Sequence, residues 1–209
     1  RNVVLVDSNS PEKVSTPGVL YKDTASGNIA VHYHHLNNMN NNLKIHMIAH
    51  NETDAPVTFT IGKLGFAGPS QDPMQVGYIE NQNYLGADSL NKTITLKPCE
   101  KYLLNADQKL ELKPAYLQSG LVDIYTEGQL TVAVAAMYPD SNWRNYTYLE
   151  NLNSAPPQSR GTYQNAAYDI GITLGAESEK IMLGYPDAFA GFINNYLLRG
   201  VDALTGGST

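Results

Sequence analysis

The sequence predicts an all-β protein of the β-sandwich or jelly-roll type, with one or two short helices and an N-terminal strand arm. Short apolar segments alternate with polar residues at a period of two, which is the pattern of strands with one buried face. Turn residues recur about every 8 to 12 positions, as in sandwiches. Segments with helical spacing are few. A chain of 209 residues, 42% of them hydrophobic, is long enough to bury one sizeable core.

The strands are predicted from the N-terminus onward. Residues 3–6, Val-Val-Leu-Val, form an unbroken apolar run, which predicts a strand buried on both faces. The polar stretch 7–18, rich in Ser, Pro and Lys, predicts a linker. The Asn-rich segment 37–42 predicts a hairpin loop between its two neighbouring strands, because Asn tolerates left-handed backbone. The remaining strands are expected at 19–22, 29–36, 43–51, 57–61, 93–97, 102–105, 109–113, 121–126, 130–138, 168–174 and 180–183.

Two segments predict short helices. Asp72 offers an N-cap and Pro73 suits the first helical position, so a helix is expected from there to about Leu85. Residues 141–150 form the second candidate, with Trp143 packed inward. No internal repeat interrupts the strand pattern. The chain is therefore expected to comprise an arm, 1–17, that contains a candidate donor strand at 2–6, and one sandwich domain, 18–209.

Charge and cysteine content exclude several classes of protein. Fourteen basic and twenty acidic side chains give a net charge of −6, which argues against binding to nucleic acid. No apolar run approaches the roughly 20 residues of a membrane-spanning helix. The single cysteine, Cys99, excludes an internal disulfide framework and a thiolate metal cluster. The chain begins at Arg1 without an apolar signal segment, so we expect a mature product or an excised fragment.

No catalytic motif is present. The sequence lacks a Gly-x-Ser-x-Gly elbow, a His-Glu-x-x-His helix, a phosphate-binding glycine loop and an Asp-x-Asp-x-Asp-Gly calcium loop. Asp123, Glu127 and Asp140 lie near a pair of predicted strands and could form a carboxylate couple for glycoside cleavage. Carboxylates beside turns are more often exposed capping groups. The sequence therefore predicts no enzyme activity and no cofactor.

The five histidines lie together, between His32 and His50. In the expected hairpin register His32, His34 and His46 share the face opposite the apolar residues. Imidazoles at this spacing could hold Zn or Cu(II). Lys44 lies among them and would repel a cation, so the alternative is a solvated or interface face.

The sequence contains two further kinds of candidate site. Trp143, Tyr146 and Tyr148 lie in one short segment, and flat aromatic faces suit pyranose rings; the alternative is that Trp143 fills the core. N-glycosylation sequons occur at Asn51, Asn91 and Asn145. In a chain so rich in Asn, Ser and Thr about this number is expected by chance, so they are permitted positions only.

Several segments, in order along nearly the whole chain, resemble an uncharacterised β-rich domain of secreted Gram-positive surface proteins. This domain often follows a copper-amine-oxidase-like stalk domain, which is absent here, so the resemblance implies no copper chemistry. It implies an extracellular, wall-associated β-domain and identifies no catalytic residue. The segments that carry the resemblance are Gly18-Val19-Leu20-Tyr21-Lys22-Asp23 with Ser26-Gly27, Tyr33-His34-His35-Leu36-Asn37, Gln75-Val76-Gly77, Leu96-Lys97-Pro98, Arg160-Gly161-Thr162-Tyr163-Gln164-Asn165-Ala166, and Gly200-Val201-Asp202 with Thr205-Gly206.

The end of the chain departs from this family. Relatives continue past the Thr-Gly turn into a closing strand with Gly-Asn-Tyr-Gly, whereas this sequence stops at Thr209. A missing strand would leave an open sheet edge, and the run Val3, Val4, Leu5 and Val6 could fill the edge of the next copy. The same run could instead pair within its own subunit. The expected function is a non-enzymatic extracellular subunit that polymerises with copies of itself; the alternative is a monomeric module that binds cell-wall polysaccharide.

Overall fold

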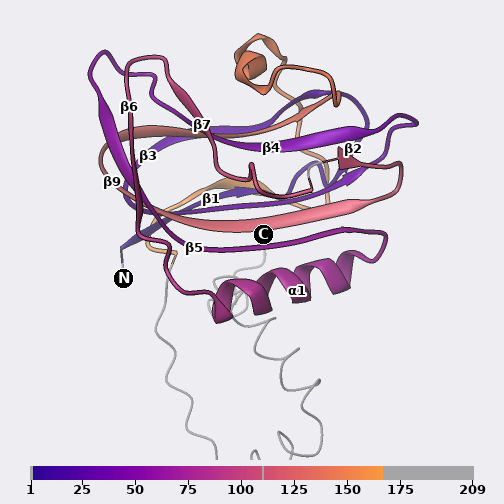
Figure 1. Cartoon of the computed structure of the whole chain (residues 1–209). Helices are drawn as coiled ribbons and strands as arrows, with labels where there is room; N and C mark the ends of the chain where they lie inside the picture. Colours follow the sequence, from indigo (N-terminus) through magenta and orange to yellow (C-terminus); the bar gives the residue numbers. More distant parts are fainter. Residues whose placement is uncertain (1, 110, 167–209) are drawn as a thin grey trace, which may run out of the picture. The chain divides into compact units, whose positions relative to one another are not determined.

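Strands make up most of the described chain, which comprises residues 2–109 and 111–166 of a computed structural model (Figure 1). The all-β prediction is confirmed. The strands lie in one compact unit, Asn2–Asn165. The strands predicted at 168–174 and 180–183, and the rest of the expected sandwich domain beyond residue 166, lie outside the described residues.

Two long strands form the centre of the sheet. β3 (Gly18–Asn37) and β9 (Leu117–Met137) pair antiparallel from Gly18 opposite Ala136 to Leu36 opposite Leu117. Each replaces two strands expected from the sequence. Where the sequence predicted breaks, the ladder has one irregularity, between Ala25/Gly27 of β3 and Thr126/Leu130 of β9, and Gly27 takes φ +80° there; a second irregularity lies at Val19/Tyr21, within a predicted strand. Such bulges bend a strand without ending it.

The bent pair gives the sheet two halves that face one another. β4 (Leu43–His50) pairs with the second half of β9, and β5 (Val57–Ser70) pairs with the first half, so the two lie on opposite sides of the core in Figure 1. β7 (Lys101–Leu103) and β8 (Glu111–Leu112) extend β4, and β6 (Lys92–Leu96) extends β5. The inner faces share one buried cluster that includes Val31, Tyr33, Ile45, Met47, Phe59, Ile61, Val122, Ile124, Val132 and Val134.

The predicted hairpin between 29–36 and 43–51 is wrong. β3 and β4 are not neighbours, because β9 lies between them in the sheet. The loop 37–42 crosses between the two halves, and buried Asn37 holds it by donating from Nδ2 to the carbonyls of Asn41 (2.9 Å) and Leu112 (2.8 Å). Alternation assigned the right residues to the inner face, but it cannot select a partner strand.

The N-terminal segment is part of the sheet, so the predicted arm and linker are corrected. β1 (Val3–Ser8) pairs parallel with β3, from Val3 opposite Asn28 to Ser8 opposite Tyr33. On its other side it pairs antiparallel with β10 (Arg160–Tyr163), which the sequence did not reveal. β2 (Lys13–Val14) follows along the same edge of β3. Within 3–6 only Val6 is fully buried, so the strand is not covered on both faces as expected.

One helix covers each half of the sheet. α1 (Pro73–Gly86) begins where predicted, with the Asp72 carboxylate accepting from the amides of Met74 and Gln75, both at 3.1 Å. It packs on β5 and β9 (Figure 1). The 3₁₀ helix η1 (Trp143–Tyr148) covers the outer face of the other half, and partly buried Trp143 packs against the cluster around Tyr146. Both predicted helices are therefore present, with Trp143 facing inward.

Gly120 of β9 lies opposite Tyr33 of β3 and Phe66 of β5, and we expect Gly120→Ala to destabilise the fold. A Cβ there would lie 2.7 Å from the Tyr33 ring and closer still to the Phe66 ring. Overpacking of this kind costs about 1–3 kcal/mol. Urea denaturation should show the loss, whereas Gly86→Ala, where a Cβ meets nothing within 4 Å, should not. Equal stability of the two variants would contradict the packing described.

Candidate functional site

An ion-paired cluster fixes β1 to its neighbours. Asp7 of β1 accepts a hydrogen bond at 2.7 Å from His32 Nδ1 of β3. The other ring nitrogen, Nε2, lies 3.4 Å from the buried carboxylate of Glu80 on α1. Ser119 of β9 donates to the same Glu80 oxygen. Three elements, β1, β3 and α1, therefore meet at the His32 ring, and β9 joins them through Glu80.

The charge on His32 holds this cluster together. Burial alone would lower the pKa of His32, but the Glu80 and Asp7 carboxylates outweigh it and raise the pKa to about 10. The ring is therefore cationic at neutral pH and separates two carboxylates that would otherwise repel each other. The neighbouring His34 differs, because burial and the positive charge of His32 lower its pKa to about 4.

A second polar contact holds the end of β1. His35 Nδ1 lies 2.8 Å from the carbonyl oxygen of Pro11 and must donate to it, so Nε2 accepts from the Ser8 hydroxyl at 2.9 Å. This is the geometry of an activated serine, but Ser8 and His35 are both 0% exposed. Burial also lowers the pKa of His35 to about 3. The pair is closed to a substrate and serves to attach β1 to β3.

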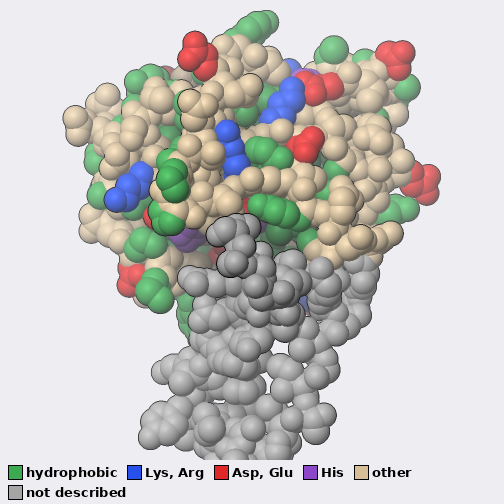
Figure 2. Space-filling view, turned by 180° about the vertical axis from the view of Figure 1, so that it is seen from behind, with side chains coloured by type: hydrophobic (Ala, Val, Ile, Leu, Met, Phe, Trp, Pro, Cys, Tyr) green, Lys and Arg blue, Asp and Glu red, His purple; other side chains and the backbone are tan. Residues whose placement is uncertain are grey.

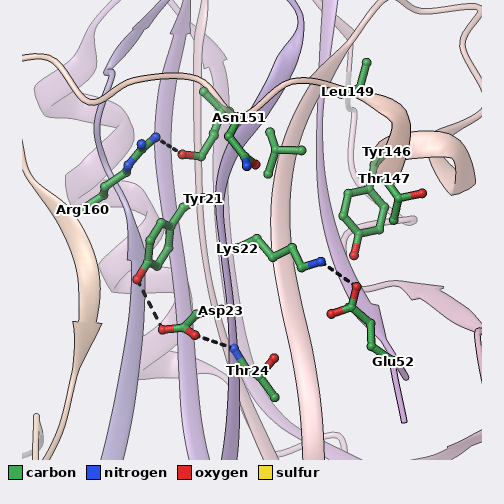
Figure 3. A pocket seen from close by; sticks show the side chains of 12 residues that line it. Tyr21, Lys22, Asp23, Thr24, Glu52, Tyr146, Thr147, Leu149, Asn151 and Arg160 are labelled. Atoms are coloured by element: carbon green, nitrogen blue, oxygen red, sulfur yellow. Dashed lines mark hydrogen bonds and ion pairs between the residues drawn. The ribbon is translucent and has the colours of Figure 1, made fainter. Parts of the chain in front are cut away.

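A groove of about 620 Å³ runs along the first half of β3 (Figure 3). On one side it is bounded by the Lys22–Glu52 ion pair, with Nζ 2.6 Å from Oε1. On the other side Arg160 of β10 donates to the carbonyls of Leu20 and Ser10. The remaining lining comes from β3 and from the end of η1: Val19, Tyr21, Asp23, Thr24, Tyr146, Thr147, Leu149 and Asn151.

The structure does not assemble the predicted metal site. His32 lies opposite Leu121, whereas His46 lies opposite Ala135, much further along β9. Burial and the charge of Lys44 lower the pKa of His46 to about 4. In the described ranges 2–109 and 111–166, no group of three or more His, Cys, Asp or Glu side chains is placed to hold a metal ion. The prediction that alternate residues share a face is correct within each strand. The prediction that histidines of the two strands lie side by side is wrong, because the hairpin does not form.

The predicted aromatic platform is not formed either. Tyr146 is 0% exposed, and its hydroxyl lies 2.8 Å from His50 Nδ1, whereas Tyr148 is 86% exposed. Trp143 is covered by the Arg144 guanidinium, 4.4 Å from the ring. The three rings therefore face different surroundings, and only Tyr146 lines the groove.

The predicted sequons differ in accessibility. Asn51 is 0% exposed and its amide is fully used, donating to the carbonyls of Ala55 (2.7 Å) and Leu96 (3.0 Å). A glycan cannot be attached there in the folded chain, so that prediction is corrected. Asn91 and Asn145 are exposed. Cys99 is an exposed free thiol.

The predicted carboxylate couple is dispersed. Asp123 accepts from the Tyr84 hydroxyl of α1 at 2.8 Å, and burial raises its pKa. Glu127 is exposed within β9, and Asp140 is exposed at the turn that follows this strand. These three residues do not converge on one site.

The surface adds two observations. Seen from behind, acidic and basic side chains lie scattered singly among polar ones (Figure 2). Among the described residues no helix is both long and apolar enough to cross a membrane.

Sequence reasoning missed both the ion-paired cluster and the groove. Asp7 was placed in a linker, and Glu80 lies on a helix with no strong apolar stripe, so nothing marked them as a pair.

The histidines predict a maximum of stability near pH 6.5. The folded pKa of His32 is raised, so its stabilising contribution is complete below 6.5 and is lost as the pH rises towards about 10. His34, His35 and His46 have lowered pKa values, so their contributions are complete above 6.5 and are lost as the pH falls towards about 4 or 3. Each group contributes a slope of about 1 kcal/mol per pH unit in its window, measurable by urea denaturation.

The variant Asp7→Asn is the control for the alkaline limb of this profile, the loss of stability above pH 6.5. It keeps the shape of the side chain and removes one of the two carboxylates that raise the pKa of His32. The loss of stability above pH 6.5 should then end at a lower pH, whereas the contributions of His35 and His46 below pH 6.5, which do not depend on Asp7, should be unchanged. An alkaline limb identical to that of the wild type would contradict the role given to Asp7.

Comparison with known proteins identifies no relative of this chain. No protein-family model matches it, and neither a curated protein nor a solved structure does. The resemblance to the surface-protein domain therefore stays a prediction.

Proposed function

We propose that this chain is a non-enzymatic extracellular structural subunit that joins copies of itself by exchanging β1. The observation that carries the proposal is the position of β1. It is an N-terminal strand held between β3 and β10, whose paired residues lie at 28–33 and 160–163. A strand of this kind can leave the slot between β3 and β10 of its own chain and enter the same slot of another copy.

Exchange would conserve the contacts that hold β1. The same ladder, the Asp7–His32 pair and the Ser8–His35 bond would form again between chains, so the balance between closed and exchanged forms depends mainly on concentration and on the connecting segment. Reciprocal exchange would give dimers, and head-to-tail exchange would give a filament. The expected open edge is therefore reinterpreted as a slot that the chain's own strand fills.

The connection to β2 limits the geometry of exchange. Residues 9–12 join β1 to β2, and four extended residues span only about 13 Å. Exchanging copies must therefore lie directly against each other. This favours a contiguous assembly over one with subunits on flexible tethers.

Composition supports the structural part of the proposal. A charged fraction of 16% with abundant Tyr gives a surface suited to contacts between copies. The Ser8–His35 pair, the one arrangement with catalytic geometry described above, is sealed from solvent.

The proposal is tested by mixing two single-cysteine proteins in a Cys99→Ser background. One carries Leu5→Cys and the other Ala30→Cys, which are partners across β1 and β3. Paired strands bring these positions to about 4.8 Å, within reach of a disulfide. Refolding the mixture at high concentration and oxidising it should give a covalent heterodimer, since Leu5 of one chain then lies beside Ala30 of another.

Chance disulfides are measured with a matched partner. Thr58→Cys replaces Ala30→Cys, because Thr58 is exposed on β5 and away from the slot. Exchange predicts many more heterodimers with Ala30→Cys than with Thr58→Cys. Equal amounts, together with a monomeric wild type by gel filtration and negative-stain microscopy, would overturn the proposal.

The rate of exchange should depend on the Ser8–His35 bond. Ser8→Ala leaves His35 Nε2 buried without a donor, which costs about 1 kcal/mol or more, so β1 should leave its slot roughly five-fold faster. The formation rate of the Leu5→Cys/Ala30→Cys heterodimer measures this. Ser15→Ala, at an exposed position after β2, should leave the rate unchanged.

A further inference from the structure

The first half of β3 has an edge that no strand of the described residues covers. On the edge away from β9, β1 pairs at Asn28–Tyr33 and β2 pairs at Leu36–Asn37. At the other end Val19 donates to the carbonyl of Glu150 and accepts from the amide of Leu152, both at 2.8 Å. Within residues 2–109 and 111–166, the stretch between these contacts, from Leu20 to Ala25, has no strand partner on this edge.

Backbone groups at this edge point outward. Thr24 lies opposite Thr131 of β9, and their hydroxyls are 2.8 Å apart, as in a non-hydrogen-bonded antiparallel pair. The Thr24 amide donates to the Asp23 carboxylate at 2.8 Å instead of to β9. Because direction alternates along a strand, the N–H and C=O of Lys22 face the same edge as those of Thr24.

The groove of Figure 3 lies along this edge and has the size of a short strand. A residue in a sheet occupies roughly 160 Å³, from its rise, strand spacing and sheet thickness. The volume of about 620 Å³ therefore has room for about four extended residues. The segment Glu150–Leu152 already pairs with β3 at one end of the groove, so the edge accepts a strand there.

The charges of the groove are balanced internally. Lys22 pairs with Glu52, whose second oxygen accepts from Thr131 at 2.8 Å. The Arg160 guanidinium is bonded to backbone carbonyls, and Asp23 accepts from Thr162 and from the Thr24 amide. Two cationic and two anionic side chains cancel, so an uncharged occupant is favoured over an ionic one.

We propose that this groove binds an extended, uncharged peptide segment of a partner protein, which adds as a strand to the Lys22–Thr24 edge of β3. The outward N–H and C=O of Lys22 and the outward C=O of Thr24, whose N–H is used by Asp23, belong to residues about 6.6 Å apart, which is the repeat of an extended peptide. The two aromatic residues of the groove do not suit a sugar. Tyr146 is buried, and the Tyr21 hydroxyl is hydrogen-bonded to Thr162 at 3.0 Å. This site is separate from the slot of β1 and does not require exchange.

A proline variant isolates the backbone contact. Lys22→Pro removes the outward N–H, which an edge strand tolerates because that group makes no ladder bond. Lys22→Ala removes the same ion pair with Glu52 and keeps the N–H. The two variants therefore differ in the one group that a guest strand needs.

The experiment is a titration of the isotope-labelled protein with the blocked hexapeptide acetyl-Val-Thr-Val-Thr-Val-Thr-amide, followed by amide NMR. Binding should shift the amides of residues 20–25 and slow their hydrogen exchange. Lys22→Pro should weaken binding about tenfold relative to Lys22→Ala, since one backbone hydrogen bond is lost. Thermal denaturation of both variants shows that they are folded.

Three results would overturn the proposal. The first is that the peptide leaves these amides unchanged in the wild type. The second is equal affinity of Lys22→Pro and Lys22→Ala. The third is that a neutral chitin oligosaccharide shifts the same amides more strongly than the peptide and equally in both variants, which would make this a sugar site. None of these outcomes depends on the cysteine experiment on β1.

Discussion

The pairing of β3 with β9 is the interaction on which the rest of the structure depends. The two strands pair almost from end to end, and the remaining large elements are attached to one of them. Bulges near Leu20 and at Gly27 bend the pair, and this bend makes one sheet into two facing layers. The position of the core depends on where the long pair bends. The slot of β1 and the groove on β3 lie on the edge of β3 that β9 does not cover.

Polar contacts, more than apolar ones, fix the N-terminal strand. Val6 is the one residue of the apolar quartet that is fully buried, whereas Asp7 and Ser8 each bind a histidine of β3. Charged and polar pairs specify register, because a slip of one residue would leave buried partners unsatisfied. The apolar run supplies affinity for the sheet edge, and the two residues after it determine the position.

Much of the fold could be predicted from the sequence, because alternation and capping are local signals. Asp72 and Pro73 marked α1, and alternation placed Ile45 and Met47 in the core and His46 on the opposite face of β4, although His46 is buried there as well. Partner choice is not local, so the β3–β4 hairpin was wrong and β10 was missed. The site was the least predictable part, because His32 gains its charge from Asp7 and Glu80, which only the assembled sheet brings together. Asn51 shows the same limit, since its sequon is visible in sequence but its burial is not.

The long separation between paired segments has a consequence for the order of folding. β3 ends at Asn37 and its partner β9 begins at Leu117, and β1 completes its pairing only with β10 at Arg160–Tyr163. Non-local pairings of this kind form slowly, because the intervening loops must close first. A ribosome must therefore release most of the chain before its central sheet can assemble. The exposed apolar segments of β3 and β9 must therefore avoid other partners for most of the time that synthesis takes.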